Sequence, residues 1–133
     1  KNKFIAQKNN IHKQKYSYLI KNNSNKKFTL VLDLDETLVQ FYTNNSLINN
    51  NEKKIIMRPG LFDFLNKVYP IFELIVWTVA TQKYADPIID IIEEKRKYFS
   101  YRLYRESATD KKTYYIKDLS KLGRDLDKIL NRF

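Results

Sequence analysis

The chain is organised as short apolar runs separated by amphipathic segments and polar turns. Residues 28–32 are almost continuously apolar and rich in branched side chains, and residues 72–78 repeat this pattern. Such runs are typical of strands that are buried on both faces of a parallel sheet. Shorter strands are predicted at 54–57, 98–104 and 113–116, and residues 124–130 lead into a last strand.

Three segments between these strands carry helix signals. After Pro59, apolar residues recur at helical spacing and predict an amphipathic helix that Pro70 ends; they are Leu61, Phe64, Leu65 and Val68. Thr81 is the expected N-cap of a second helix, whose predicted apolar face is Tyr84, Ile88, Ile91 and Ile92. A short helix is expected at 118–122, ended by Gly123.

The alternation of strands and helices in short units predicts an α/β fold with a mostly parallel sheet flanked by helices. In such sheets, ligands bind beyond the carboxyl ends of the strands. Three segments directly follow a predicted strand, namely Asp33 to Thr37, Thr78 and Lys117. These are therefore the candidate functional residues.

Length and composition fit one globular domain. The 133 residues are 43% hydrophobic, which is enough for one core, and the absence of cysteine excludes disulfides and thiolate sites. No stretch approaches the roughly 20 apolar residues of a membrane span. We divide the chain into a basic, polar and loosely ordered lead-in, residues 1–26, and a core, residues 27–133.

The net charge of +10 attracts anions, including nucleic acid, anionic lipid and phosphorylated peptide, without choosing among them. Residues 1–27 hold eight lysines and no acidic residue, and asparagine is frequent there as well. We interpret this bias mainly as a proteome rich in lysine and asparagine, with a dedicated polyanion-binding arm as the alternative. The first residue is Lys rather than Met, so the sequence does not establish where the natural chain begins.

Asp33 and Asp35 are two residues apart at a strand end, so both carboxylates can point toward one site. Paired carboxylates repel each other and favour a cation between them, and Mg²⁺ suits this role because it prefers oxygen ligands. One Asp can then attack a phosphoryl group, while the other protonates the leaving alkoxide and later activates water. Thr78 and Lys117 can supply hydrogen bonds and charge to the phosphoryl oxygens, Thr78 through its hydroxyl and its backbone N–H.

Each of these groups has an ordinary structural explanation when it is taken alone. Asp33 and Asp35 can cap a turn, Thr78 can end a strand, and Lys117 can be a solvated lysine. Three such groups, each at a strand end of one α/β domain, favour the functional interpretation over the structural one.

The string from Val31 to Val39, VLDLDETLV, is similar to the signature of haloacid-dehalogenase-type phosphatases. More narrowly, it resembles the small phosphatases that act on the C-terminal domain of RNA polymerase II, the NLI-interacting-factor-like family. Segments resembling later motifs of that family follow in order, at residues 58–60, 77–80, 102–107 and 115–120. The resemblance covers roughly residues 27–129.

This resemblance implies a Rossmann-like, haloacid-dehalogenase-like fold and a Mg²⁺-dependent protein serine/threonine phosphatase with an aspartyl-phosphate intermediate. It implies Asp33 as nucleophile and metal ligand, and Asp35 as general acid/base that also binds the metal through its backbone carbonyl. Thr78 and Lys117 become phosphate binders. Supporting positions are Thr37 and Arg58. The implied substrate is a phosphorylated protein or peptide, such as the RNA polymerase II C-terminal domain, in the nucleus or cytoplasm.

Two departures from the family stand out. The family completes its metal site with an acidic residue, in an Asp-Asn or Asp-Asp pair, that should fall near Arg132 or Phe133, but residues 128–133 read KILNRF. We expect a fragment or misread gene model that diverges after Leu130, in preference to a truncated and weakly active relative. The segment between Val39 and Arg58 is also shorter than in the animal enzymes, so substrate choice does not carry over.

Two other functions stay open at this point. A non-catalytic binding module, such as a mitochondrial inner-membrane import receptor-like domain, fits the missing acid, but such a domain has no need to keep the phosphatase residues. The second is nucleic-acid binding, which the positive net charge of the chain suggests. No recognition motif accompanies the basic lead-in, so we expect no direct contact with nucleic acid. The sequence leaves the oligomeric state unknown.

Overall fold

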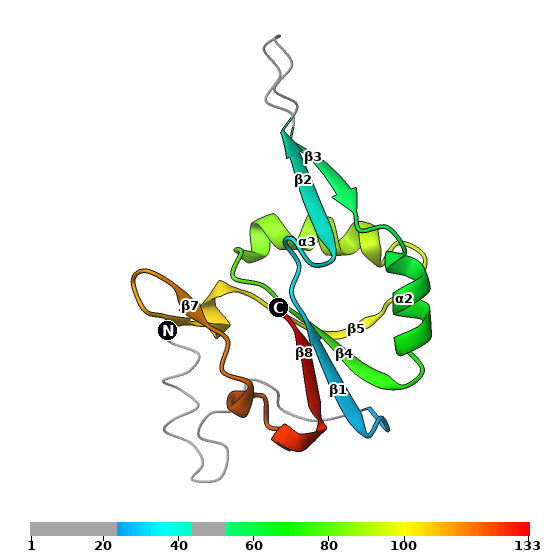
Figure 1. Ribbon diagram of the computed structural model, residues 1–133, viewed down its shortest axis with the longest axis vertical. Coiled ribbons are helices and arrows are strands. Elements are labelled where there is room, and N and C mark those ends of the chain that lie inside the picture. The colour runs from blue at the N-terminus through cyan, green and yellow to red at the C-terminus, as the bar shows by residue number, and fades with distance from the viewer. Residues whose placement is uncertain (1–23, 44–52) are drawn as a thin grey trace.

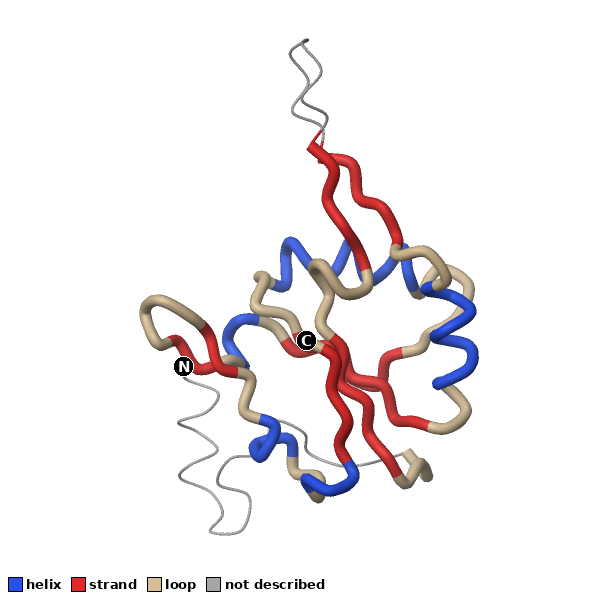
Figure 2. The backbone as a smooth tube through the Cα atoms, in the orientation of Figure 1, coloured by secondary structure: helices blue, strands red, loops and turns tan. Residues whose placement is uncertain are grey.

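The computed structural model describes residues 24–43 and 53–133. Its centre is a four-stranded sheet with the order β5-β4-β1-β8, in which every neighbouring pair is parallel (Figures 1 and 2). The strands are β1 (Phe28–Leu32), β4 (Phe72–Trp77), β5 (Phe99–Leu103) and β8 (Ile129–Arg132). The predicted α/β class with a parallel sheet is confirmed.

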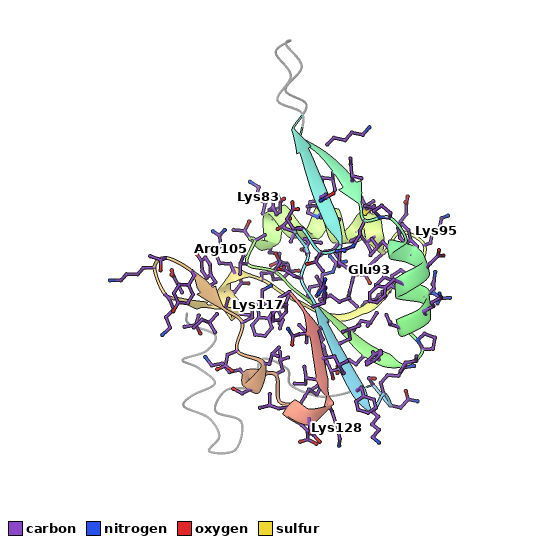
Figure 3. The ribbon with its side chains drawn as sticks, viewed as in Figure 1. Lys83, Glu93, Lys95, Arg105, Lys117 and Lys128 are labelled. Carbon is purple, nitrogen blue, oxygen red and sulfur yellow. The ribbon has the colours of Figure 1, made fainter. Side chains whose placement is uncertain are left out.

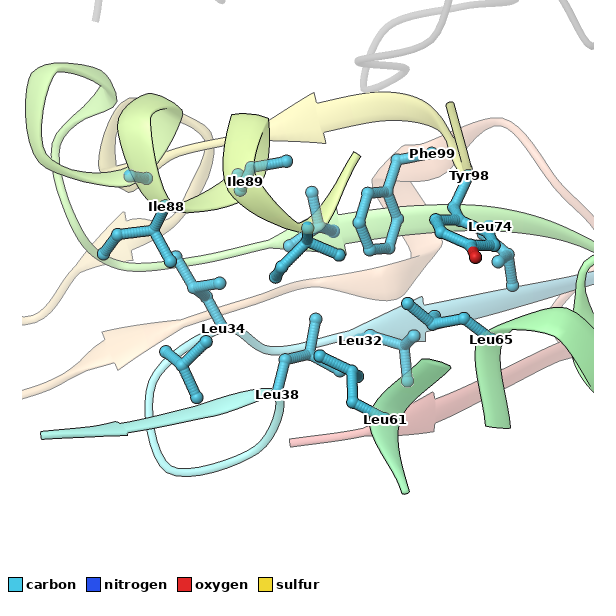
Figure 4. Close-up of a cluster of buried hydrophobic side chains, with 14 of the residues drawn as sticks. Leu32, Leu34, Leu38, Leu61, Leu65, Leu74, Ile88, Ile89, Tyr98 and Phe99 are labelled. Carbon is cyan, nitrogen blue, oxygen red and sulfur yellow. The ribbon is translucent and has the colours of Figure 1, made fainter. Parts of the chain in front are cut away.

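The two faces of the sheet are covered differently. Helices α2 (Leu61–Val68) and α3 (Gln82–Ile92) both pack on the face that carries Leu32 and Val76 (Figure 4). On the opposite face, Val31 and Trp77 contact Leu122 of the short 3-10 helix η2 (Leu119–Leu122). Because side chains alternate along a strand, β1 and β4 contribute to both clusters and are apolar except at Thr29 and Glu73.

The buried face of α3 differs from the predicted one. Its buried residues are Ala85, Ile88, Ile89 and Ile92, whereas Tyr84 and Ile91 are exposed. Both sets have helical spacing, so periodicity alone does not choose between them. Packing against the sheet determines which stripe is buried, because the sheet lies against the stripe centred on Ile88 and Ile89. On α2, Leu61 and Leu65 are buried as predicted, but Phe64 is exposed.

An antiparallel hairpin projects from the body of the molecule (Figure 1). It joins β2 (Val39–Thr43) to β3 (Lys53–Met57), with Val39 opposite Met57. The strand predicted at 54–57 is confirmed, but its partner β2 was not predicted. Most of the polar loop predicted at 43–53 lies outside the described residues, as does most of the basic lead-in.

The segment after β5 has little regular structure. It contains the 3-10 helices η1 (Arg105–Ser107) and η3 (Leu126–Lys128), and a short antiparallel pair of strands, β6 (Thr109–Asp110) and β7 (Tyr115–Ile116). The strand predicted at 113–116 is thus shorter than expected. Gly123 follows η2 with φ 72°, a left-handed conformation that glycine adopts without strain, so the predicted stop is confirmed.

A buried ion pair fixes this C-terminal segment to the sheet. Arg124 donates to both carboxylate oxygens of Glu73 on β4, at 2.8 and 3.0 Å, and the hydroxyl of Thr29 on β1 donates to the same carboxylate at 2.9 Å. The side chains of Glu73 and Arg124 are 1% and 8% exposed. The C-terminal segment is therefore fixed at Arg124 to the two central strands, near their amino ends.

None of the helices in the described part of the chain is both long enough and apolar enough to cross a membrane.

Candidate active site

The candidate residues gather at one edge of the sheet. Asp33 follows β1 and Thr78 follows β4, and these strands are parallel neighbours with Leu32 opposite Val76. Their carboxyl ends therefore lie side by side, as the topology predicted. Lys117 comes from the segment after β7 and lies near the end of β8 (Figure 3).

The contact between Lys117 and Asp33 defines the centre of the site. The Lys117 Nζ atom lies 3.0 Å from Asp33 Oδ1, and the Lys117 side chain is only 8% exposed. Burial lowers the pKa of Lys117 from its ordinary value, and the nearby carboxylates of Asp33 and Asp35 oppose this shift. The sequence predicted both residues, and the structure brings them into contact.

Asp35 has a partner that the sequence did not reveal. The Tyr84 hydroxyl, from the first turn of α3, donates to Asp35 Oδ1 at 3.3 Å. Burial raises the pKa of Asp35, with the charges of Asp33 and Glu36 adding to the effect and the Tyr84 hydrogen bond opposing it. Burial and the Asp35 carboxylate raise the pKa of Tyr84 to about 12. The sequence pattern assigned Tyr84 to the apolar face of α3. Its position shortly after Thr78, at the end of a predicted strand, could have indicated that it lies near the site.

The loop after β1 is held in a tight turn. Leu34 and Leu38 are fully buried and anchor it, and the backbone N–H of Leu38 donates to the carbonyl of Leu34 at 2.9 Å. Within the turn Glu36 has φ 59°, a left-handed conformation that is strained for a residue with a side chain. The Asp33 carboxylate also accepts the Leu34 N–H at 2.8 Å, which fixes its orientation.

Thr78 is completely buried at the end of β4. Its backbone N–H donates to the carbonyl of Leu103 at 2.9 Å, and its hydroxyl oxygen accepts the N–H of Ala80 at 3.0 Å. The expectation that the Thr78 N–H would contact phosphate is therefore wrong in this structure, since the sheet uses that donor. The hydroxyl proton is the donor that Thr78 retains for a ligand.

Thr37 and Arg58 lie together, but to one side of the Lys117–Asp33 contact. The Arg58 guanidinium donates to the Thr37 carbonyl at 3.2 Å, and the Arg58 backbone N–H donates to the carbonyl of Leu38 at 2.9 Å. Both residues line a largely apolar groove of about 500 Å³ that α2, β1 and β8 also border. Arg58 is thus placed to support the loop that carries the two aspartates.

The donors present fit a hard cation such as Mg²⁺. Asp33 and Asp35 offer carboxylate and carbonyl oxygens at one strand end, and Mg²⁺ is commonly held by one or two carboxylates with water and phosphate. Within residues 24–43 and 53–133, no cluster of three or more His, Cys, Asp or Glu side chains is placed to hold a metal.

The end of β8 reaches the site as the resemblance required. The Asp33 N–H donates to the carbonyl of Arg132 at 2.9 Å, and the Lys117 ammonium lies 4.4 Å from the centre of the Phe133 ring. An aromatic ring thus lies beside Lys117, at the position where the resemblance led us to expect an acidic residue.

Comparisons with known proteins identify the family of the chain. The family model described as NLI interacting factor-like phosphatase matches residues 28–131. A probable C-terminal domain small phosphatase of Dictyostelium discoideum is 40% identical over 111 residues, which are 74% of this chain and 35% of that protein. The human carboxy-terminal domain RNA polymerase II polypeptide A small phosphatase 1 is 36% identical over 117 residues, 78% of this chain and 44% of that protein. The chain thus spans less than half the length of these relatives.

Solved structures share the fold. Fission yeast Fcp1, an RNA polymerase II CTD phosphatase solved as a variant bound to beryllium fluoride, matches with a TM-score of 0.60 and 21% identity. That match covers 79% of this chain and 36% of the other chain. A second Fcp1 structure gives a TM-score of 0.62, with 22% identity and 37% of that chain covered. The haloacid-dehalogenase-like fold is therefore confirmed.

Proposed function

Because this chain belongs to the family of NLI interacting factor-like phosphatases, we propose that it is a protein serine/threonine phosphatase with Asp33 as its nucleophile. The observation that carries the proposal is the contact of the buried Lys117 ammonium with the Asp33 carboxylate. It places a positive charge beside the oxygen that would accept a phosphoryl group. The names of the relatives favour a phosphorylated protein as substrate, with the RNA polymerase II C-terminal domain as the leading candidate and a nuclear or cytoplasmic location.

In the first step, an Asp33 carboxylate oxygen forms a bond to phosphorus as the bond from phosphorus to the serine or threonine oxygen breaks. Asp35 gives its proton to that leaving oxygen, which departs as a hydroxyl group. Burial raises the pKa of Asp35, which favours the protonated form that this step requires. Lys117 and the Thr78 hydroxyl hold the other phosphoryl oxygens.

In the second step, water attacks the phosphorus of the aspartyl-phosphate on the face that the leaving oxygen vacated. Asp35, now ionised, takes a proton from this water, and inorganic phosphate leaves. Asp33 returns as a free carboxylate, so atoms and charges balance over the cycle. The turn through Glu36, whose φ is 59°, separates the strand end that carries Asp33 from the rest of the loop.

Magnesium would be held by the Asp33 carboxylate and the Asp35 carbonyl. When bound, it supplies the charge neutralisation that lets two anions, a carboxylate and a phosphate ester, approach each other.

The retained site favours the enzyme over a non-catalytic binding module. A module needs neither a buried lysine beside a carboxylate nor a tyrosine hydroxyl on a second one, and removing a lysine from water costs free energy that an ion pair only partly offsets. The buried Lys117 also argues against a nucleic-acid binder, because a cation that binds nucleic acid must be exposed to reach the phosphates.

Hydrolysis of p-nitrophenyl phosphate tests the proposal. We expect activity in Mg²⁺ that falls by roughly 10³-fold or more in Asp33→Asn, because the nucleophile is lost. The matched control is Asp63→Asn, an exposed aspartate of α2, which should retain full activity. Circular dichroism checks that both variants fold. Full activity of Asp33→Asn would refute the assignment, and a folded wild type without activity in Mg²⁺ would favour the binding module.

A further inference from the structure

A second concave surface lies between the two helices, apart from the catalytic edge. It has a volume of about 630 Å³ and is bordered by α2, the end of α3 and the turn that follows. Its main lining residues are Phe62, Asn66, Ile91, Lys95, Arg96 and Tyr98. Figure 3 shows Lys95 beside α2, at the edge of the view, and Lys117 nearer its middle. We refer to this surface as the interhelical hollow.

Two large apolar side chains from different helices are left in water at the interhelical hollow. Phe62 of α2 is 44% exposed and Ile91 of α3 is 52% exposed. Neither faces the sheet, since α2 buries Leu61 and Leu65 and α3 buries the stripe around Ile88. Single exposed apolar residues are common, but two that converge on one concavity are typical of a binding surface.

Arg96 is held in place at the rim of the interhelical hollow. Its guanidinium lies 5.2 Å from the centre of the Tyr69 ring and donates to the Asn66 side-chain carbonyl at 3.4 Å. The Tyr98 hydroxyl donates to the same Asn66 oxygen at 3.0 Å, which orients the amide. Within the described residues, no carboxylate forms an ion pair with Arg96 or with its neighbour Lys95.

The charge at the interhelical hollow selects the kind of partner. Glu94 is the acidic residue in its lining, against Lys95 and Arg96, and the whole chain carries a net charge of +10. A guanidinium held by stacking has lost part of its rotamer freedom, so it pairs with a carboxylate at a lower entropic cost. Aromatic and arginine side chains beside an apolar pocket are the usual centres of binding energy in protein interfaces.

We propose that the interhelical hollow is a docking site for an acidic, amphipathic segment of a partner protein. Apolar side chains of that segment pack between Phe62 and Ile91, and an Asp or Glu of the segment pairs with Arg96. The proposal does not depend on the catalytic assignment, because none of the hollow's residues belongs to the Asp33 site. If the partner is a substrate, docking at the hollow raises the local concentration of its phosphorylated residue near Asp33.

Selection from a random 12-residue peptide library displayed on phage tests the proposal on the full chain. We expect the enriched peptides to combine two or more apolar residues with Asp or Glu. Synthetic fluorescein-labelled versions should bind at least 10-fold more weakly to Phe62→Ser, Ile91→Ser and Arg96→Glu than to wild type. The matched controls are Ile71→Ser, exposed but outside the hollow, and Lys128→Glu, which should bind like wild type.

Three outcomes would overturn the proposal. They are no enrichment, enriched peptides without acidic residues, and binding that the three hollow variants do not weaken. Light scattering provides a further check, because a dimer that Phe62→Ser dissociates would identify a second copy of the chain as the occupant. The melting temperature and the rate of p-nitrophenyl phosphate hydrolysis of each variant should match those of the wild type. Such a match shows that weaker peptide binding does not come from unfolding or from a change at the Asp33 site.

Discussion

The buried pair of Glu73 and Arg124 provides a quantitative test of how the site is held. In Glu73→Gln the side chain keeps its size and one acceptor oxygen, but Arg124 loses the opposite charge that it contacts at 2.8 and 3.0 Å. Because Arg124 is 8% exposed, water cannot replace that partner. Breaking such a pair on one side costs about 3–5 kcal/mol, a large part of the roughly 5–15 kcal/mol that stabilises a domain.

Urea unfolding measures this cost through the fluorescence of Trp77, the one tryptophan in the sequence and a fully buried residue. With a slope of about 2 kcal/mol per M, the urea midpoint of Glu73→Gln should fall by about 1.5–2.5 M. The double variant Glu73→Gln/Arg124→Met should be more stable than the sum of the single changes predicts, since it leaves no unpaired charge.

The control is Lys128→Met, which breaks the exposed pair of Lys128 with Asp125, whose side chains are 42% and 72% exposed. That change should cost less than about 1 kcal/mol. If Glu73→Gln costs no more than Lys128→Met, or if the double variant is simply additive, then the pair does not hold the C-terminal segment as we argue.

Three further predictions concern the site and its supports. Burial raises the pKa of Asp86, but hydrogen bonds from Tyr104, Gln82 and Arg102 outweigh it and hold the pKa below its ordinary 3.8. Ionised Asp86 therefore stabilises the fold above pH 3.8, and this stabilisation is lost as the pH falls below that value. The unfolding free energy of Asp86→Asn, measured by urea titration, should change less than that of the wild type below about pH 4. Thr78→Val should lower kcat/KM for p-nitrophenyl phosphate by about 10–100-fold, while Thr78→Ser should stay near the wild-type value. Equal losses of kcat/KM in the two variants would show that the Thr78 hydroxyl does not bind phosphate. Chelation with EDTA should abolish hydrolysis and added Mg²⁺ restore it, so activity that survives EDTA would contradict the metal assignment.

Much of the central sheet and three of the key side chains were predictable from local pattern. The runs at 28–32 and 72–78 are apolar without alternation, which indicates strands buried on both faces. Asp33 and Thr78 follow those runs, so parallel pairing was enough to place them at one edge. Lys117 was identified as the residue after a predicted strand, but that strand, β7, belongs to the separate antiparallel pair with β6, so tertiary packing and not the parallel sheet brings Lys117 to Asp33.

Features that depend on which surfaces meet were not available from the sequence. Periodicity offered two stripes on α3, and packing against the sheet turned Tyr84 out of the core and onto Asp35. Nor does the sequence indicate that the Thr78 N–H is used by Leu103, because that bond joins separate strands.

The sequence by itself determined the strands of the central sheet, the order of the motifs and the chemical types at the strand ends, because these depend on side chains within a few positions of one another. The tertiary structure alone decided that Glu73 pairs with Arg124, that Tyr84 donates to Asp35, and that Phe62 and Ile91 share one hollow. Each of these arrangements brings together residues far apart in the chain, so it depends on how the strands and helices pack and not on the local sequence.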